Sequence, residues 1–303
     1  MATARAPGRK TIVISQVVHM GDIVACEPII RHMRQVQPDA FIIVALQKNY
    51  RELADSHPEV DHTLALECVT EWIKFASVMS FDKVIDLNIY ERACPICHIP
   101  WRKLKGSGGV TTSNYYFFPN LLAAFTASAA ITAVADAPRM YVNRRNIKFV
   151  DALKLPKKFV CLHVASNEFE REFPVEKWRK VIEHISARWR IPIVEIGLKS
   201  ALNLGKSDRN LCGQLSIVQS AEVIRRSLLY LGSDSGPAHL ANAVGAYGII
   251  LLGYYRHFKK YMPYTGNYGE GKNSELIYHE GTVTDLPVDR VLSAIDRRLA
   301  KEI

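Results

Sequence analysis

The stretch LLYLGSDSGPAHLANAVG, residues 228–245, decides the fold. It opens with a short apolar run, 228–232, which is typical of a buried strand. Small residues follow, and Pro237 stands where a helix would have its first turn, a position that favours proline. A buried strand that runs directly into a helix is the repeating unit of an α/β fold with a parallel sheet.

The same alternation continues on both sides of this stretch. Further strands are predicted at 11–17, 41–46, 83–87, 159–165, 191–197 and 248–253. Amphipathic helices are predicted between the strands, and the last covers 288–299. A polar break with a proline at 153–158 separates two such series, so we expect two tandem Rossmann-like domains with a cleft between them. The expected domains are 1–155 and 156–303, and the last helix could pack on either.

The composition is typical of a folded protein with two domains, and the net charge is compatible with several kinds of anionic partner. The chain has 303 residues, of which 48% are hydrophobic and 23% are charged, so each domain can bury a core and a disordered chain is excluded. Lys plus Arg is 39 and Asp plus Glu is 30, which gives a net charge of +9. Such a charge attracts phosphates, anionic lipid heads or nucleic acid without choosing among them.

The chain is expected to be cytoplasmic. Its basic start leads only into the short apolar run TIVISQVV, so no signal peptide is expected. The weakly polar run 121–135 is shorter than the roughly 18 residues of a membrane-spanning helix, and it predicts buried helix instead. The six cysteines are scattered, which is typical of reduced, packed thiols.

The first candidate site is the segment His19-Met20-Gly21-Asp22, between the first strand and the first helix. Ligands of doubly wound folds bind outside the carboxyl ends of the strands, so this segment should face the cleft. Gly21 would let the backbone pass tightly. Asp22 either caps the helix, where the macrodipole favours a carboxylate, or serves as a general base toward a hydroxyl.

The second candidate site is the turn at 232–236, where a strand leads into a helix. Backbone N–H groups at such a helix N-terminus form an anion site that suits a diphosphate. The polarity of Asp234, Ser235 and His239 in so short a segment favours a ligand site over a purely structural turn. We expect this turn and Asp22 to face each other across the cleft.

Several strings, in this order along the chain, carry a family resemblance: Gly21-Asp22 with Pro28, HVAS at 163–166, FPVEKW at 173–178, DSGPAHLANAVG at 234–245 and LLG at 251–253. They resemble glycosyltransferase family 9, the ADP-heptose lipopolysaccharide heptosyltransferases and their relatives. The resemblance implies the two-domain B-type glycosyltransferase fold, with the acceptor on the N-terminal domain and the nucleotide-sugar on the C-terminal one. It also implies a metal-independent, inverting transfer to a lipopolysaccharide-like or other glycan acceptor, with no cofactor.

The resemblance also implies roles for single residues. Asp22 corresponds to the base that deprotonates the acceptor hydroxyl, with Gly21 beside it. Ser166 corresponds to a phosphate-contacting position, and Arg171 would supply a cation to the leaving diphosphate where the family often has Lys-Arg-Trp-Pro. The residues that correspond to the border of the diphosphate, together with a histidine one turn further on, are Asp234, Ser235, Gly236 and His239.

One departure from the family concerns the donor. Relatives often carry an acidic residue that contacts the ribose after the strand equivalent to 191–197, whereas this chain has Leu198-Lys199. ADP-heptose is the first expectation for the donor, and another nucleotide-sugar is the alternative. A further alternative is a non-catalytic nucleotide-binding or nucleic-acid-binding protein of the same fold.

The string CPICH, residues 94–98, matches the C-x-x-C-H pattern of covalent haem attachment. Haem attachment is generally a process of exported chains, which this start does not indicate. A zinc or iron site would need further ligands, and Cys68, His62 and His57 are too loosely spaced along the sequence to count. We expect a structural or acceptor-side loop and no metal; the alternative is a metal site that includes Cys94, Cys97 and His98.

Two basic segments remain. The loop 254–261 interleaves tyrosines with cations, which suits a donor-side loop, a solvated surface or a nucleic-acid surface. We expect the first and no nucleic-acid partner. The second segment would favour peripheral contact with the anionic inner membrane, where a lipid-linked acceptor resides, or is a solvated helix face. Its basic residues are Arg139, Arg144, Arg145 and Lys148.

Overall fold

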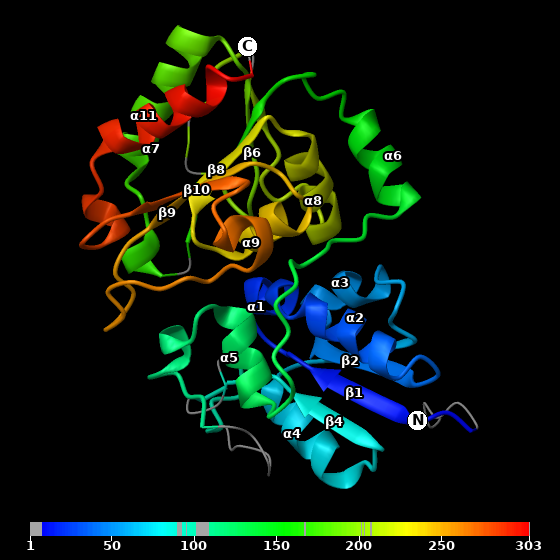
Figure 1. Cartoon of the computed structure of the whole chain (residues 1–303). Coiled ribbons are helices and arrows are strands. Elements are labelled where there is room, and N and C mark those ends of the chain that lie inside the picture. The colour runs from blue at the N-terminus through cyan, green and yellow to red at the C-terminus, as the bar shows by residue number, and fades with distance from the viewer. Residues whose placement is uncertain are drawn as a thin grey trace. The chain divides into compact units, whose positions relative to one another are not determined.

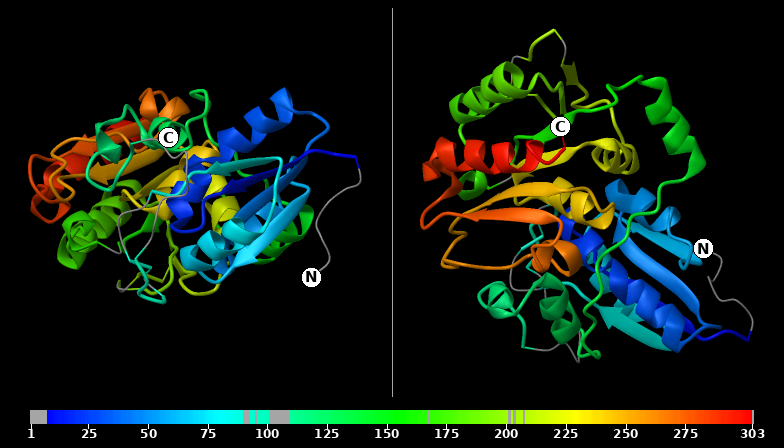
Figure 2. Two further views of the ribbon diagram at one scale, coloured as in Figure 1. Left: turned by 90° about the horizontal axis from the view of Figure 1, so that it is seen from below. Right: turned by 45° about the horizontal axis from the view of Figure 1, so that its top comes forward.

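The computed structural model describes residues 8–89, 93–94, 96–100, 109–166, 168–200, 202, 204–206 and 208–302 (Figures 1 and 2). The chain forms two compact units. Unit 1 consists of Met1–Tyr141 with Met262–Gly266, and unit 2 consists of Val142–Tyr261 with Asn267–Ile303.

Unit 1 is a parallel sheet with helices on both faces. Its strands are β1 (Thr11–Ser15), β2 (Phe41–Gln47), β3 (His62–Leu66) and β4 (Lys83–Asp86), in the order β3-β2-β1-β4. Helices α2 (Glu27–Val36) and α3 (Arg51–Asp55) lie on one face, and α4 (Val69–Val78) lies on the other (Figure 1). The short α1 (Met20–Ala25) follows β1, and α5 (Leu121–Ser128) packs against it. Opposite faces follow from right-handed crossovers, because the chain leaves β1 first toward β2 and later returns to β4.

Unit 2 is a second parallel sheet of the same kind. Its strands are β5 (Val160–His163), β6 (Ile193–Glu195), β7 (Arg209–Asn210), β8 (Leu229–Ser233), β9 (Gly248–Leu252) and β10 (Ser274–Tyr278), in the order β10-β9-β8-β5-β6-β7. Helix α7 (Val175–His184) packs against α11 (Val288–Leu299), and α8 (Ile217–Arg226) packs against α9 (Gly236–Ala243) and α6 (Arg144–Ala152). The short α10 covers Gly266–Gly269. The predicted α/β class with two parallel sheets is therefore confirmed.

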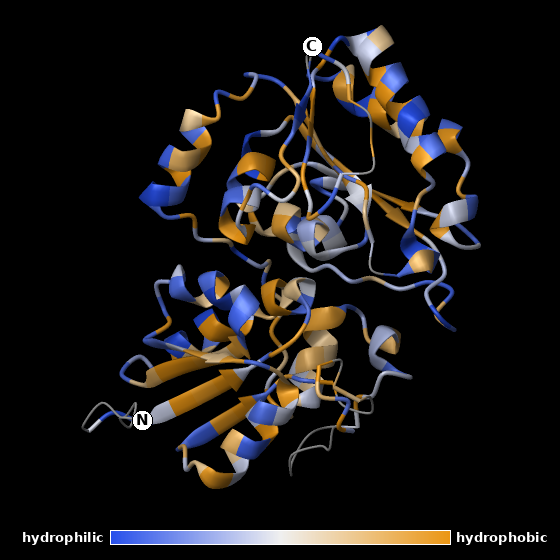
Figure 3. Cartoon of the chain, turned by 180° about the vertical axis from the view of Figure 1, so that it is seen from behind, coloured by the Kyte–Doolittle hydropathy of each residue, from blue (hydrophilic) through white to orange (hydrophobic). Residues whose placement is uncertain are grey.

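Continuous apolar runs became central strands. All residues of β5 are buried, and β5 lies between β8 and β6. Figure 3 shows the same in colour: the strands of both units are predominantly hydrophobic, whereas the helices are mixed. Three strands were not predicted from the sequence: β3, an edge strand of unit 1, and β7 and β10, the edge strands of unit 2. An edge strand such as β3 stays partly exposed and carries no continuous apolar run.

One helix differs from expectation, and the buried helix predicted within the run 121–135 is confirmed. The helix predicted after the first strand is split at Cys26, because Pro28 occupies the first turn of α2 and has no N–H to continue α1. The run 121–135 forms a single helix, α5, which ends before Ala130, a residue with a left-handed φ of 52°. Across the described ranges, no helix combines the length and apolar character needed to cross a bilayer.

The units divide between Tyr141 and Val142, ahead of the boundary expected near residue 155. Helix α6 accounts for the difference, because it packs on α8 and thereby belongs to unit 2. Its residue Asp151 also forms an ion pair with Arg226 of α8 at 2.7 Å. Helix α11 belongs to unit 2 as well.

Candidate functional site

Asp22 lies at the carboxyl end of the unit 1 sheet, where the strand order reverses. β1 has β2 on one side and β4 on the other, so the loops that follow β1 and β4 diverge there. This is the position at which doubly wound folds bind ligands. Gly21 and Asp22 stand in the first turn of α1, and both are half-buried.

A buried hydrogen-bond network holds the end of β1 against β4. Asn88 Nδ2 donates to Ser15 Oγ at 2.6 Å and to Asp86 Oδ1 at 2.8 Å. Asn88 Oδ1 accepts from the Val17 N–H at 3.0 Å. All three network side chains are buried. Because a buried network with its partners in place is rigid, it orients the chain that leaves β1 and enters α1.

The tight passage into α1 occurs at His19 rather than at Gly21. His19 has φ 65° and ψ 107°, a left-handed backbone that costs a non-glycine residue about 1–2 kcal/mol. Gly21 lies inside the helix and has no positive φ. Strained backbone of this kind persists where the surrounding structure determines it, and it often accompanies a functional site.

Asp22 acts electrostatically on two neighbours. Burial, and then the Asp22 charge, raise the pKa of Tyr50, which ends the 3₁₀ turn Lys48–Tyr50 after β2. Burial and Asp22 also raise the pKa of Cys26. Tyr50 therefore joins Asp22 at this edge of the sheet. Tyr50 was not predicted as a site residue, and the available signal was its position directly after the strand that neighbours β1.

The second candidate site lies at the corresponding reversal in unit 2. β5 lies between β8 and β6, and His163 at the end of β5 pairs with Gly232 of β8. The loop with Ser166 and the turn with Asp234 therefore leave the sheet from neighbouring strands. Helix α9 begins at Gly236, with proline in its first turn and no side-chain cap from Ser235. The predicted strand, turn and helix are confirmed in place.

Asp234 is a buried carboxylate at the centre of a polar cluster. It is 2% exposed, and its Oδ2 accepts a hydrogen bond from the Tyr261 hydroxyl at 3.1 Å. Arg171 Nη1 lies 3.3 Å from the same oxygen, and His239 Nε2 lies 4.0 Å from Oδ1. The Arg171 guanidinium also stacks on the Tyr255 ring, 3.9 Å from its centroid. Three of the predicted site residues, Asp234, Arg171 and His239, are thus brought together.

His163 is a further member of this site, for which no role was predicted from the sequence. Burial lowers its pKa to about 4, so the ring is neutral near pH 7. Its Nδ1 lies 3.4 Å from Ser235 Oγ. On its other side is Gly197, whose φ of +141° favours glycine and whose missing Cβ would lie 3.2 Å from the ring. The string HVAS carried the signal, because His163 comes directly before the loop with Ser166.

The loops around Asp234 are joined to each other. Ser166 is half-buried, and its Oγ accepts a hydrogen bond from the Glu168 N–H at 3.2 Å. The Tyr255 hydroxyl lies 3.4 Å from Glu168 Oε1, and the Arg256 N–H donates to Glu170 Oε2 at 3.0 Å. The segment after β5 and the loop after β9 are therefore held together.

The loop 254–261 presents its charges outward and two of its rings inward. Tyr255 and Tyr261 are 5% and 3% exposed and pack around Arg171. By contrast, the basic side chains of the loop are exposed: Arg256, His257, Lys259 and Lys260. Rings packed in this way do not form the stacking surface that single-stranded nucleic acid requires.

The carboxyl end of β6 carries the departure noted in the sequence. Leu198 is 93% exposed and Lys199 is exposed as well. The acidic side chain of this region, Glu195, is instead fully buried in β6, where it accepts a hydrogen bond from the Ser200 hydroxyl. Burial, and then the Glu195 charge, raise the pKa of Cys212 to about 12.

In unit 1, Cys94 and Cys97 approach Cys68, with all three sulfurs within 4.8 Å of one another. Burial raises the pKa of Cys94, but hydrogen bonds from the Cys97 and Ile96 backbones and from the two other thiols outweigh it, so that its pKa is about 6. His98 is exposed and is not part of this group. The expectation that Cys68 is too loosely placed is wrong, because β3 ends just before it and brings it to the loop.

Comparisons with known proteins agree with this geometry. A family model described as glycosyltransferase family 9 (heptosyltransferase) matches residues 135–276. The lipopolysaccharide core heptosyltransferase OpsX of Haemophilus influenzae is 21% identical, with 89% of this chain and 85% of the relative covered.

Solved structures show the same fold over both units. A glycosyltransferase family 9 structure from Veillonella parvula has a TM-score of 0.68 and 14% identity, covering 96% of this chain and 97% of that one. The ADP-heptose lipopolysaccharide heptosyltransferase II of Escherichia coli has a TM-score of 0.66 and 16% identity, covering 97% and 99%. The ordered sequence strings, the family match over residues 135–276 and the shared fold agree, and they identify a heptosyltransferase-like glycosyltransferase that is similar to glycosyltransferase family 9.

Proposed function

We propose that this enzyme transfers a heptose from ADP-heptose to a hydroxyl of a lipopolysaccharide core or similar glycan acceptor, with inversion at the anomeric carbon. The names of its relatives support the substrates: one is a lipopolysaccharide core heptosyltransferase, and an E. coli heptosyltransferase of the same fold was solved with ADP. The observation that carries the proposal is Asp22 in the first turn of α1, at the strand reversal of the unit 1 sheet.

Asp22 is the proposed general base, and Gly21 lies beside it on the acceptor side. In an inverting transfer, the acceptor hydroxyl attacks the anomeric carbon opposite the departing diphosphate and loses its proton to the base. A helix N-terminus favours the ionised carboxylate, so proton transfer accompanies bond formation rather than preceding it. The half-buried position of Asp22 suits this role, because a group in contact with solvent can exchange its proton after each turnover.

Unit 2 is the proposed donor side. The N-terminus of α9, with Ser235 and Gly236, offers backbone N–H groups and the positive end of the helix dipole to the diphosphate. Ser166 supplies a hydroxyl from the neighbouring loop. This arrangement stabilises the leaving group without a metal ion.

Arg171 requires a refined role. Its guanidinium pairs with Asp234, so the pair carries no net charge and the helix amides become the main anion-binding groups. Asp234 and His239 then position Arg171 and the start of α9 rather than contact the substrate themselves.

A second donor is favoured by one observation. The exposed Leu198-Lys199 pair stands where relatives often carry a ribose-contacting acid. A nucleotide other than ADP would therefore leave the fold and the proposed base intact and change only the sugar that is moved.

A nucleotide panel tests the donor assignment directly. The thermal shift of the full chain is measured with ADP, UDP, GDP and CMP, since a ligand at about 100 times its Kd adds roughly 2.7 kcal/mol of stability. Stabilisation by ADP, followed by heptose transfer from ADP-heptose, supports the proposal. Stabilisation by UDP alone removes the heptose assignment, and no shift with any nucleotide contradicts a nucleotide-sugar donor.

The same proposal places the enzyme in the cytoplasm, in peripheral contact with the inner membrane. Arg144, Arg145 and Lys148 on α6 and the nearby Arg139 are exposed and basic, and each such residue near an anionic surface contributes about 1 kcal/mol. Sedimentation with phosphatidylglycerol vesicles, but not with phosphatidylcholine vesicles, is expected at low salt. Equal sedimentation with both, or with neither, would argue for a solvated helix face.

A further inference from the structure

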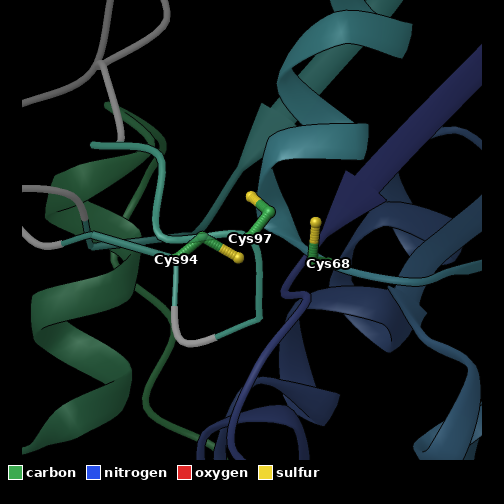
Figure 4. A group of neighbouring side chains, drawn as sticks. All are labelled: Cys68, Cys94 and Cys97. Atoms are coloured by element: carbon green, nitrogen blue, oxygen red, sulfur yellow. The ribbon is translucent and has the colours of Figure 1, made fainter.

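Three cysteines from two separate segments of unit 1 meet at one point (Figure 4). Cys68 directly precedes α4, whereas Cys94 and Cys97 belong to the loop 93–100, in which the structure describes every residue except 95. Their sulfurs all lie within 4.8 Å of one another. Cys94 and Cys68 are 1% and 7% exposed, and Cys97 is exposed, so the cluster has one buried side and one solvent side.

The loop is folded back on itself around Cys94. The Cys94 N–H donates to the Ile99 carbonyl, and the His98 N–H donates to the Cys94 carbonyl, both at 2.9 Å. Ala93 and Pro100 form an antiparallel bridge that closes the loop. This closure holds Cys94 and Cys97 in a fixed relation to each other, which a C-x-x-C ligand pair requires.

Backbone amides point at the Cys94 sulfur. The Cys94 sulfur accepts from the N–H groups of Ile96 and Cys97. Cys68 is the N-cap residue of α4, and its side chain accepts no capping hydrogen bond. Amides directed at sulfur stabilise the thiolate, and the thiolate is the form that binds metals.

A hydroxyl completes the surroundings of the third sulfur. The Cys97 thiol and Thr70 Oγ1 are 3.1 Å apart. Once the thiol has lost its proton, this hydroxyl can donate to the sulfur instead. Hydrogen bonds of this kind orient the ligands of a metal and adjust their basicity.

Neither of the simpler explanations needs this arrangement. Cys68 and Cys94 also pack in the apolar core with Val13 and Trp72. Packing in an apolar core alone does not require backbone amides that point at a sulfur. A disulfide would join two of the sulfurs at about 2.05 Å and would not explain why the third lies beside them. In a tetrahedral zinc site the sulfurs lie about 3.8 Å apart, because each zinc–sulfur bond is about 2.3 Å. Sulfurs already within 4.8 Å need only a small adjustment to reach that separation.

We propose that Cys68, Cys94 and Cys97 bind a structural zinc ion that ties the loop 93–100 to the start of α4. The thiols bind as thiolates and release their protons to solvent. The fourth ligand approaches from the solvent side, where Cys97 is exposed. It is either the neighbouring His98 or a water molecule. The ion stabilises unit 1 and takes no part in glycosyl transfer.

The test measures metal content of the full chain and does not depend on transferase activity. The protein is expressed with added zinc, purified under reducing conditions without chelator, and analysed by elemental mass spectrometry. One zinc per chain is expected, together with thiolate-to-metal charge-transfer absorption after chelator treatment and titration with Co²⁺. Absence of both the zinc and the cobalt absorption overturns the proposal.

Matched variants locate the site. Cys97→Ser removes an exposed ligand with little risk to folding and is expected to lose the zinc, whereas Cys212→Ser in unit 2 keeps it. Thr70→Val is expected to weaken zinc affinity by about 10- to 100-fold without removing a ligand. Weaker binding in His98→Ala assigns the fourth position to His98, and unchanged binding assigns it to water. Full zinc content in Cys97→Ser, or a Cys94–Cys97 disulfide in protein purified without reductant, contradicts the site.

Discussion

The strand reversals of the two sheets each carry an aspartate next to the helix that follows, yet the two carboxylates have different surroundings. Asp22 is half-buried in the first turn of α1. Asp234 is 2% exposed, is paired with Arg171, and accepts a hydrogen bond from Tyr261. A carboxylate in contact with solvent can exchange protons with it, whereas a buried carboxylate that is paired with a cation holds its neighbours in place. Burial, rather than residue type or topology, therefore separates the proposed base from a positioning group.

The largest expected effect is on catalysis by unit 1. Asp22→Asn removes the proposed proton acceptor while keeping the shape of the side chain, so transfer should fall by about 10²- to 10⁴-fold or more. Release of nucleoside diphosphate measures the rate, and calorimetry measures nucleotide binding, which should be retained. The exposed Asp39 of unit 1 provides the control, since Asp39→Asn should change neither quantity. Equal loss of binding and transfer in Asp22→Asn would make Asp22 structural.

The second effect is on the stability of unit 2. Asp234→Asn leaves the Arg171 charge without its partner, and removing one member of a buried pair costs about 3–5 kcal/mol. Because Arg171 is 15% exposed, we expect the free energy of unfolding to fall by about 3 kcal/mol. Urea unfolding followed by tryptophan fluorescence measures this loss. As a control, Asp289→Asn at an exposed position of α11 should change the free energy of unfolding by no more than about 1 kcal/mol. A loss in Asp22→Asn as large as that in Asp234→Asn would erase the distinction between the two carboxylates.

The third effect is a pH dependence that arises in unit 2. The pKa of His163 is about 4 because of burial, against an ordinary value of 6.5, so between these pH values the unfolded chain binds a proton that the folded chain does not. Stability should therefore fall as the pH drops from about 6.5 to about 4, by as much as about 3 kcal/mol. Unfolding at a series of pH values measures this slope. His163→Gln should flatten it, whereas the exposed His62→Gln of unit 1 should not; an unchanged slope in His163→Gln would assign the effect elsewhere.

The smallest expected effect is on stability, when a glycine of each site is replaced by alanine. Gly197→Ala places a Cβ 3.2 Å from the His163 ring at a φ of +141°, and it should cost about 1–2 kcal/mol. Gly21 lies within α1, where alanine is the better helix former, so Gly21→Ala should be neutral or stabilising by up to about 1 kcal/mol. Thermal unfolding of both variants provides the measurement. A large loss in Gly21→Ala would show that α1 has no room for a methyl group there.

Much of the fold could be predicted because central strands are apolar along their whole length. The runs that became β1, β2, β5, β8 and β9 were recognised for this reason, as was the proline in the first turn of α9. The edge strand β4 was also recognised, but the edge strands β3, β7 and β10 were not, since one side of an edge strand has no neighbour to bury it and a continuous apolar run is not required there. The helix split at Cys26 was also missed, although Pro28 carried the signal.

The candidate site could be predicted in its members and not in their contacts. Asp22, Ser166 and the turn after β8 follow strands, and the carboxyl ends of parallel strands meet at one edge. The contacts of Arg171 could not be predicted, because they join residues about 60 to 90 positions apart in the sequence. Arg171 pairs with Asp234, and the rings of Tyr255 and Tyr261 pack around its guanidinium. The same applies to Cys68. It is far from Cys94 along the sequence, but β3 places it next to Cys94 in the fold.

By itself, the sequence determined the α/β class, the order of the central strands and helices, and the resemblance to a glycosyltransferase family, because local apolar periodicity and short strings around tight turns are properties of neighbouring residues. Only the tertiary structure decided that Asp234 is buried whereas Asp22 is half-buried, that His163 is neutral, and that the sulfurs of three cysteines lie close together. The physical reason is that burial, charge pairing and ligand geometry arise between segments distant along the chain, and no local pattern records which of them meet.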